Sequence, residues 1–507
     1  MKRKNFIFPM LLIFILFQCC SPTGSDGDGS NEQNNQTLRL TSISPTSKVA
    51  HMPTFTLTAR GTKFVSGSKI VFNGTEKQTT YVSAAELICQ IEPDDTVLNS
   101  AVTSDTMGIS RILSETVTVF VRNPSSEGGD SNSLNFTIES NHTFYETMDI
   151  SGDLEHACPA ITTDSTGNIY VVCNDTPFGT REVYFICSTD DGESWNQPAN
   201  ISNNLRDSAF PAIAVDTAGN INVVWSDDTP GIYDTYFIRS TDNGNSWCQP
   251  VNISNNSGNS WSSTIAVDNA GNINAAWFDD TSGDWQIYFS RSTDNGVNWS
   301  QPVTIANIND FDGESSIPIA VDSAGNIYAA WYDDEEGPTG EEIFFSRSTD
   351  NGNTWSQPVN ISNNSEYSEN PAIAVDNADG INIVWSGATP DYNYDIYFSR
   401  STDHGVNWNP PVNISNNPEY STEPDFAIDS AGNINVVWTN VSSSPPYEEM
   451  IYFSRSIDNG ITWNQVENIS NNNTDSWRPC IAVDSLGNVN VACNCGKEVI
   501  HFTRSTR

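Results

Sequence analysis

The sequence predicts an all-β protein in which an immunoglobulin-like β-sandwich precedes a seven-bladed β-propeller. Two repeats that run in step through residues 142–507 indicate the propeller, and alternating apolar and polar positions over residues 38–139 indicate the sandwich. The first repeat, Ser-x-Asp-x-Gly-x-x-Trp, occurs six times, and its successive tryptophans are 52 to 56 residues apart. This spacing is typical of propeller blades, which are small antiparallel sheets.

The second repeat is an apolar strand, a turn that contains Asp, and another apolar strand, as in residues 212–225. Each unit is expected to form four strands separated by Asp, Gly and Asn turns. The turn aspartates occur seven times, as Asp164, Asp216, Asp268, Asp322, Asp376, Asp429 and Asp484. Seven copies of this repeat against six of the first predict seven blades, of which the last is incomplete.

The incomplete blade predicts how the ring closes. The seventh unit reaches its third strand at residues 499–504, whereas residues 144–150 resemble an outer strand with no blade in front of it. We therefore expect this N-terminal strand to pair with residues 499–504 and complete the last blade. Closure would remove two sheet edges that otherwise invite aggregation.

The first repeat resembles the Asp-box, or BNR repeat, of the sialidase-like propellers. The resemblance implies a structural role on the face opposite the active site: the Asp binds turn amides, the Gly supplies a positive φ and the Trp packs between sheets. The positions to which this role carries over are Asp190, Trp195, Asp242, Trp247, Asp294, Trp299, Asp350, Trp355, Asp403, Trp408, Asp458 and Trp463.

Residues 38–139 resemble an IPT/TIG domain, a variety of immunoglobulin-like β-sandwich. The resemblance rests on segments such as 43–45, 61–64, 116–124 and 133–136. It implies a spacer or an adhesive module, because the basic loops of the DNA-binding versions do not occur in this sequence.

Residues 1–20 have the basic start and short apolar run of a secretory signal. They resemble a lipoprotein signal in which Cys19 or Cys20 is lipidated, and Gln18, in place of a small residue, leaves that choice open. An ordinary signal peptide or an uncleaved anchor is the alternative. Residues 21–37 are predicted to be a flexible tether. The expected location is the cell envelope, outside the cytoplasm, with a lipid anchor in the outer membrane or at the cell surface.

The net charge of −41 excludes one class of partner. Nucleic-acid affinity depends on Lys and Arg contacts to phosphate, and Lys497 is the only lysine of the predicted propeller. We therefore expect no nucleic-acid partner. The acidity favours solubility, uptake of divalent cations or a saline habitat. The oligomeric state is open, and a monomer is the expectation. Cysteines cluster in the first, second and seventh units, which predicts either a disulfide across the closure or buried thiols at Cys173 and Cys493.

Carboxylates in the predicted loops are candidate ligands. An acidic residue lies two positions after the second-strand Trp or Cys in four consecutive units, at Asp175, Asp227, Asp279 and Asp333. An arc of this kind can hold Ca²⁺ or bind sugar hydroxyls, and turn capping is the alternative role. A weaker calcium-loop pattern consists of Asp310, Asp312 and Glu314. No cofactor is required, and Ca²⁺ is the one that these residues allow.

Aromatic and arginine residues outside the repeats are the other candidates. Trp261, Trp285 and Trp477 can stack on sugar rings or pack within turns. A sialidase needs three arginines to clamp a carboxylate, with a Tyr nucleophile, a Glu and an Asp acid. Most arginines here sit at one repeated position, and the family's Arg-Ile-Pro element does not occur. Arg181, Arg206 and Arg478 remain, and an approach of Arg206 to Arg478 across the closure is the remaining route to a site for an acidic sugar.

These observations leave three hypotheses. The first is a lipid-anchored surface protein whose non-catalytic propeller binds a glycan, a protein or a cation. The second is a sialidase-like glycoside hydrolase or lyase, which would bring Arg181, Arg206 or Arg478 together with a carboxylate and a Tyr in the central cavity. The third is a purely architectural module for adhesion or display.

Overall fold

A computed structural model describes residues 37–507 with gaps at 50–54, 93–102, 105–109, 112–113, 140–142, 145–146, 153, 155–157, 177–178, 310, 312, 314, 335–339, 365, 391–392, 444, 446, 471–474, 497–498 and 507. The described residues form strands, turns and one 3₁₀ turn at Ser125–Glu127, with no α-helix among them, so the all-β prediction is confirmed. In this part of the chain no helix could span a membrane. The predicted signal, with Cys19 and Cys20, lies outside the described residues.

The N-terminal region forms two sheets around one apolar core. The first sheet has the order β1 (Arg39–Ser44), β3 (Phe55–Thr62), β7 (Glu86–Ile91) and β6 (Thr79–Ser83). The second has the order β2 (Ser47–Val49), β11 (Leu134–Glu139), β10 (Ser114–Arg122), β4 (Lys69–Phe72) and β5 (Thr75–Glu76), and a separate pair joins β8 (Thr103–Ser104) to β9 (Ser110–Arg111). Because strand side chains alternate between faces, Val117, Val119 and Val121 of β10 all enter the core.

The C-terminal region begins with six sheets of four strands, each in chain order. The first sheet contains β14 (Ala160–Thr163), β15 (Ile169–Asp175), β16 (Glu182–Ser188) and β17 (Ala199–Asn200), and the second contains β18 (Ser208–Val215), β19 (Ile221–Asp227), β20 (Asp234–Ser240) and β21 (Val251–Asn252). The third contains β22 (Ser260–Val267), β23 (Ile273–Asp279), β24 (Gln286–Ser292) and β25 (Val303–Asn307), and the fourth contains β26 (Ile319–Val321), β27 (Ile327–Asp334), β28 (Glu341–Ser348) and β29 (Val359–Asn360). The fifth contains β30 (Ser368–Val375), β31 (Ile381–Ala388), β32 (Tyr394–Ser401) and β33 (Val412–Asn413), and the sixth contains β34 (Tyr420–Ile428), β35 (Ile434–Val441), β36 (Glu449–Ser456) and β37 (Glu467–Asn468).

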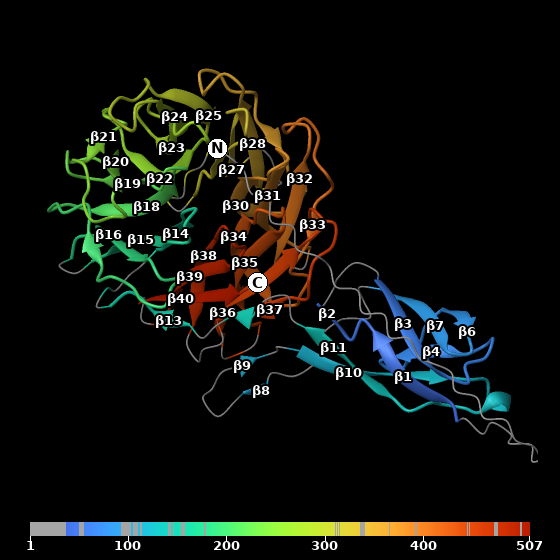
Figure 1. The fold of residues 1–507 in the computed structure, drawn as a ribbon. Coiled ribbons are helices and arrows are strands. Elements are labelled where there is room, and N and C mark those ends of the chain that lie inside the picture. The colour runs from blue at the N-terminus through green and yellow to red at the C-terminus, as the bar shows by residue number, and fades with distance from the viewer. Residues whose placement is uncertain are drawn as a thin grey trace, which may run out of the picture.

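The last sheet combines the two ends of this region. It contains β38 (Ser476–Val483), β39 (Val489–Cys495) and β40 (Val499–Thr506), and both β12 (Thr143–Phe144) and β13 (Met148–Asp149) pair with β40. Met148 lies opposite Phe502 in an antiparallel register, so the predicted pairing of the N-terminal strand is confirmed. The first strand of each sheet contacts the first strand of the next, and β38 contacts β14 (Figure 1).

The Asp-box residues form the same turn in each copy. In the third sheet the hydroxyl of Ser292 donates to Asp294 at 2.9 Å, and Asp294 accepts the backbone N–H of Asn298 at 2.8 Å. Trp299 then packs edge-on against Phe237 of the preceding sheet, with ring centroids 5.2 Å apart. The Asp-box turn therefore joins each sheet to the one before it.

The turn after each first strand is held by its aspartate in one of two ways. In five sheets a buried arginine of the third strand pairs with it, as Arg291 does with Asp268 at 2.7 Å. In the other two a tyrosine of the second strand donates to it, as Tyr170 does to Asp164 at 2.9 Å. The repeated arginines are thus part of the scaffold, as the sequence predicts.

Candidate functional site

Five of the first strands carry a β-bulge at one repeated position, six residues before the turn aspartate. The pairing register shifts there, as between Ala209 and Ala212 of β18. The bulged residues have φ between 49° and 53°, and they are Phe210, Ser262, Asn370, Glu423 and Arg478. Left-handed backbone is costly for residues other than Gly, and bulges re-aim side chains beside functional sites. The same strained backbone conformation thus recurs at one position in five sheets.

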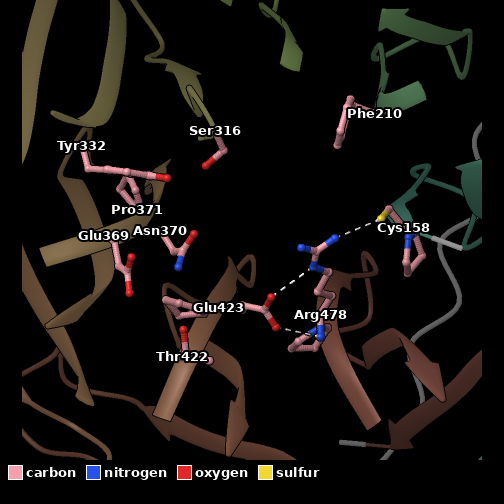
Figure 2. Close-up of a pocket in the computed structure, with 13 residues that line it drawn as sticks. Cys158, Phe210, Ser316, Tyr332, Glu369, Asn370, Pro371, Thr422, Glu423 and Arg478 are labelled. Atoms are coloured by element: carbon pink, nitrogen blue, oxygen red, sulfur yellow. Dashed lines mark hydrogen bonds and ion pairs between the residues drawn. The ribbon is translucent and has the colours of Figure 1, made fainter. Parts of the chain in front are cut away.

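The bulge position lines one cavity of about 350 Å³, which we call the central cavity. Six sheets each contribute the residue at this position, namely Cys158, Phe210, Ser316, Asn370, Glu423 and Arg478. The other lining residues are Pro159, Tyr332, Glu369, Pro371, Thr422, Pro424 and Pro479. A thiol, an aromatic ring, a hydroxyl, an amide, a carboxylate and a guanidinium therefore surround one space, although the repeats around them are nearly uniform (Figure 2).

Arg478 is fixed between two neighbours on one side of the central cavity. Its Nε atom donates to Oε1 of Glu423 at 3.1 Å, and its Nη1 atom donates to Sγ of Cys158 at 3.4 Å (Figure 2). Thr439 also donates to the Glu423 carboxylate, at 3.0 Å. Burial acts to lower the pKa of Arg478, but Cys158 and Glu423 outweigh it, so the pKa lies above its usual value.

The opposite side of the central cavity carries Tyr332 and Glu369 (Figure 2). Close to Glu369, Tyr394 and Tyr420 have ring centroids 4.8 Å apart. Burial raises the pKa of Tyr394, the carboxylate of Glu369 raises it further, and burial raises the pKa of Tyr420 to about 12. These phenols are therefore protonated at neutral pH and serve as hydrogen-bond donors.

Asp425 lies two residues along β34 from Glu423. Its carboxylate accepts the backbone N–H groups of Ile481 in the next sheet and of Phe426, both at 2.9 Å. Burial raises its pKa to about 6, although these two hydrogen bonds oppose the shift. A carboxyl group with this pKa exchanges a proton near neutral pH.

An aromatic group adjoins Phe210. The rings of Trp261 and Phe210 have centroids 5.6 Å apart, and Trp261 lies 3.9 Å from Tyr233. Tyr233 and Arg181 both bind Asp207, at 3.2 and 3.1 Å. Phe210 is the member of this group that lines the central cavity, and Arg181 and Asp207 form the polar side of the group.

The predicted arginines and tryptophans are placed differently from one another. Of the arginines, only Arg478 lines the central cavity; Arg206 is 58% exposed and pairs weakly with Asp228 at 4.0 Å. The expected approach of Arg206 to Arg478 is not among the described contacts, because each binds an acidic residue of its own surroundings. Trp285 packs on Phe311 at 4.3 Å. Trp477 is half-buried and directly precedes Arg478.

The predicted arc of carboxylates is buried in the scaffold. Asp227 accepts hydrogen bonds from Trp225, Ser208 and Asn204 at 2.9, 2.9 and 2.7 Å. Asp279 has the equivalent partners, and backbone N–H groups donate to Asp175 and Asp333. These four buried aspartates therefore accept hydrogen bonds from groups of the scaffold, and they are not exposed to a ligand on the surface.

No described group of three His, Cys, Asp or Glu side chains could hold a metal ion. Asp310, Asp312 and Glu314 lie outside the described residues, so the calcium-loop prediction stays a prediction. The eight described cysteines are free thiols, and burial raises the pKa values of Cys173 and Cys493. The expected disulfide is thus replaced by the alternative of buried thiols.

Sequence reasoning missed most of the central cavity, including Glu423, Glu369, Tyr332 and Cys158. A signal for it does exist in the sequence. The position six before the turn aspartate and the one before it change chemical type from unit to unit, whereas a Pro usually follows them and an apolar strand then repeats. A residue that varies on a repetitive scaffold points to recognition rather than packing.

Comparison with known families agrees with the two resemblances drawn from the sequence. Residues 206–436 and 271–504 match the BNR repeat-like domain, and together these matches span more than half of the chain. The chain belongs to this family. Residues 38–138 match the IPT/TIG domain. No curated protein matches the chain.

Several solved structures of carbohydrate-active proteins have a similar fold. An ulvan lyase of polysaccharide lyase family PL25, bound to -[GlcA(1-4)Rha3S]-, matches with a TM-score of 0.50 and 13% identity over 70% of this chain and 95% of that one. An α-L-arabinanase of Penicillium chrysogenum has a TM-score of 0.44 and 14% identity, over 59% and 93% of the two chains. The intramolecular trans-sialidase of Ruminococcus gnavus has a TM-score of 0.40 and 12% identity, over 72% and 96%. At 13% identity the likeness to the ulvan lyase concerns the fold alone.

Proposed function

We propose that this is an exported, lipid-anchored surface protein whose seven-bladed β-propeller binds a neutral carbohydrate in the central cavity. Residues 38–139 act as a spacer that holds the propeller away from the membrane. The observation that carries the proposal is the convergence of one variable position from six sheets on a single cavity, with a β-bulge at that position in four of the six.

The contacts between successive sheets support the seven-bladed ring. Each first strand contacts the next, and Thr163 of β14 donates to the carbonyl of Val483 in β38 at 3.0 Å. Trp195 of the first sheet packs on Phe502 of the last, with ring centroids 4.8 Å apart. Seven sheets joined in this way would make a closed ring whose remaining edges are the outer strands, most of them short.

The chemistry of the cavity favours a neutral sugar. Its volume of about 350 Å³ is within the range of small-ligand sites. The carboxylates of Glu369 and Glu423 can accept hydrogen bonds from hydroxyl groups, and the rings of Tyr332 and Phe210 can pack on the apolar face of a sugar. Arg478 is the one cationic residue described in the lining, and its pairing with Glu423 opposes binding of a second anion.

A second candidate is a glycoside hydrolase or lyase. It is favoured by the presence of Arg478, two glutamates and Tyr332 in one cavity. A sialidase-type clamp would need two further arginines beside Arg478, and the described lining contains none. Binding of a carbohydrate without catalysis is therefore the function that we favour. If the propeller binds no ligand, a purely architectural role is the third alternative.

A glycan array probed with purified residues 38–507, followed by calorimetry on the best neutral glycan, tests the proposal. We expect Arg478→Ala to weaken binding at least about tenfold, a loss of about 1.4 kcal/mol. Arg206→Ala, the matched control, should leave affinity unchanged. Equal affinity in the two variants would contradict the cavity as the site. Release of products from the bound glycan would favour the enzyme.

The anchor is tested separately by palmitate labelling in cells. Labelling of the full chain that is lost when Cys19 and Cys20 are both replaced by Ala supports lipidation. Labelling that persists in the double variant would contradict it.

A further inference from the structure

The fifth sheet lacks a carboxylate that the second and third sheets contain. In the second sheet, Oδ2 of Asp227 accepts hydrogen bonds from Nε1 of Trp225, Oγ of Ser208 and Nδ2 of Asn204. These donors are neutral, and the carboxylate is only 1% exposed. One carboxylate oxygen thus satisfies three donors from three parts of the sheet.

The third sheet repeats this arrangement. Oδ2 of Asp279 accepts from Nε1 of Trp277 at 3.0 Å, from Oγ of Ser260 at 2.9 Å and from Nδ2 of Asn256 at 2.5 Å. The three donors are therefore built to surround a carboxylate.

The fifth sheet keeps the donors and loses the acceptor. Trp385, Ser368 and Asn364 occupy the donor positions, but Gly387 stands where the aspartate would be. Trp385 is 1% exposed, and its Nε1 atom has no hydrogen-bond partner among the described residues. Asn364 donates to Ser368 at 2.9 Å. An unsatisfied buried donor costs about 1–3 kcal/mol.

The sixth sheet shows that an amide does not replace the carboxylate. The side-chain oxygen of Asn440 accepts from Ser421 at 3.0 Å and from Asn417 at 3.1 Å. Nε1 of Trp438 has no partner among the described residues. The full set of three donors is satisfied only where a carboxylate is present.

We propose that Trp385, Ser368 and Asn364 form a binding site for a small carboxylate, which takes the place of the missing aspartate side chain. This site lies outside the central cavity and does not depend on the proposed function. Asn364 is exposed, which gives the site access to solvent. A Cβ atom on Gly387 would lie 2.8 Å from the ring of Tyr397, so a formate ion fits better than an acetate, whose methyl group would approach that ring.

Thermal unfolding of residues 38–507 in sodium formate, compared with sodium chloride of equal ionic strength, tests the site. Ligand binding to the folded state raises the midpoint as the logarithm of the ligand concentration, and we expect a rise of about 2 °C at a formate concentration several times the Kd. Acetate should give a smaller rise. An identical midpoint in formate and chloride would overturn the proposal.

Matched variants locate the effect. Ser368→Ala should abolish the formate-dependent rise, whereas Ser208→Ala, the same change in the sheet that has its own carboxylate, should retain it. If Ser368→Ala does not fold, Trp385→Phe and its control Trp225→Phe make the same comparison. A rise that survives in Ser368→Ala or Trp385→Phe would overturn the assignment. Glycan binding in the central cavity is measured independently, so failure here leaves that proposal standing.

Discussion

Arg478 and Glu423 are the bulged residues of two neighbouring first strands, and they bind each other at 3.1 Å, from Nε to Oε1. Both side chains are partly exposed, so the pair adds little to stability. Its effect is on orientation, because it holds a cation and a carboxylate at fixed places in the central cavity. Two strained backbone positions are thus joined by one ion pair at the candidate site.

The first prediction concerns the strain at the bulges. Ser262 has φ of 49°, where Gly is favoured and a β-branched residue is strongly disfavoured. Ser262→Gly should leave the free energy of unfolding unchanged or raise it by about 0.5 kcal/mol, and Ser262→Val should lower it by about 2 kcal/mol. Urea denaturation of the two variants measures the difference. Equal stability would show that the bulge does not constrain this position.

The sequence was sufficient for the elements of the fold. The spacing of the Asp-box tryptophans and the turn aspartates locates the strands, and the unmatched strand at residues 144–150 predicts the closure. These features depend on local turn chemistry and on alternation, which a single sequence displays directly.

The bulge and the cavity could not be predicted in the same way. A bulge is a shift in pairing between two strands, and at Phe210 and Glu423 the sequence shows only that the residue type changes from unit to unit. Asp227 illustrates the opposite case: it resembles a ligand-binding residue by type and position, but its partners come from a loop and a strand that only the fold brings together.

The second prediction uses the two ways of holding the turn aspartate. Arg291→Cys removes the buried partner of Asp268 and should destabilise the protein by about 3–5 kcal/mol. In the first sheet Tyr170 lies opposite Cys187, just as Asn274 lies opposite Arg291 in the third sheet. The double variant Arg291→Cys with Asn274→Tyr therefore reproduces the arrangement of the first sheet. It should recover most of the lost free energy of unfolding. Chemical denaturation of both variants tests whether the tyrosine can replace the arginine as the partner of Asp268. A double variant no more stable than Arg291→Cys would contradict it.

The third prediction concerns the closure. A fragment of residues 143–507 retains β12 and β13, and we expect it to be monomeric. A fragment that begins at residue 151 leaves one edge of β40 unpaired and should associate or aggregate. Light scattering after size-exclusion chromatography distinguishes the two. A monomeric shorter fragment of equal stability would show that these strands are dispensable.

The fourth prediction is a loss of stability in acid. Hydrogen bonds from the backbone and side chain of Asn407 lower the pKa of Asp403 to about 2, and hydrogen bonds from the residue four positions on also lower the pKa values of Asp190, Asp242, Asp294 and Asp350. The unfolded value is about 3.9, so their contribution is complete above that pH and is lost as the pH falls toward 2.

Denaturation between pH 2 and pH 6 measures this dependence. Asp403→Asn removes one titrating group, so its stability should fall less steeply with decreasing pH than that of the wild type. Identical slopes in the two proteins would mean that Asp403 does not contribute to acid unfolding.

Binding of a neutral sugar in the central cavity is tested most directly by a crystal structure of residues 38–507 with the neutral glycan that binds best on the array. We expect a sugar ring in the central cavity, with hydroxyl groups within hydrogen-bond distance of Glu369 and Asn370 and a ring face against Phe210 or Tyr332. A glycan bound to the outer strands or to residues 38–139, with the central cavity free of sugar, would contradict it.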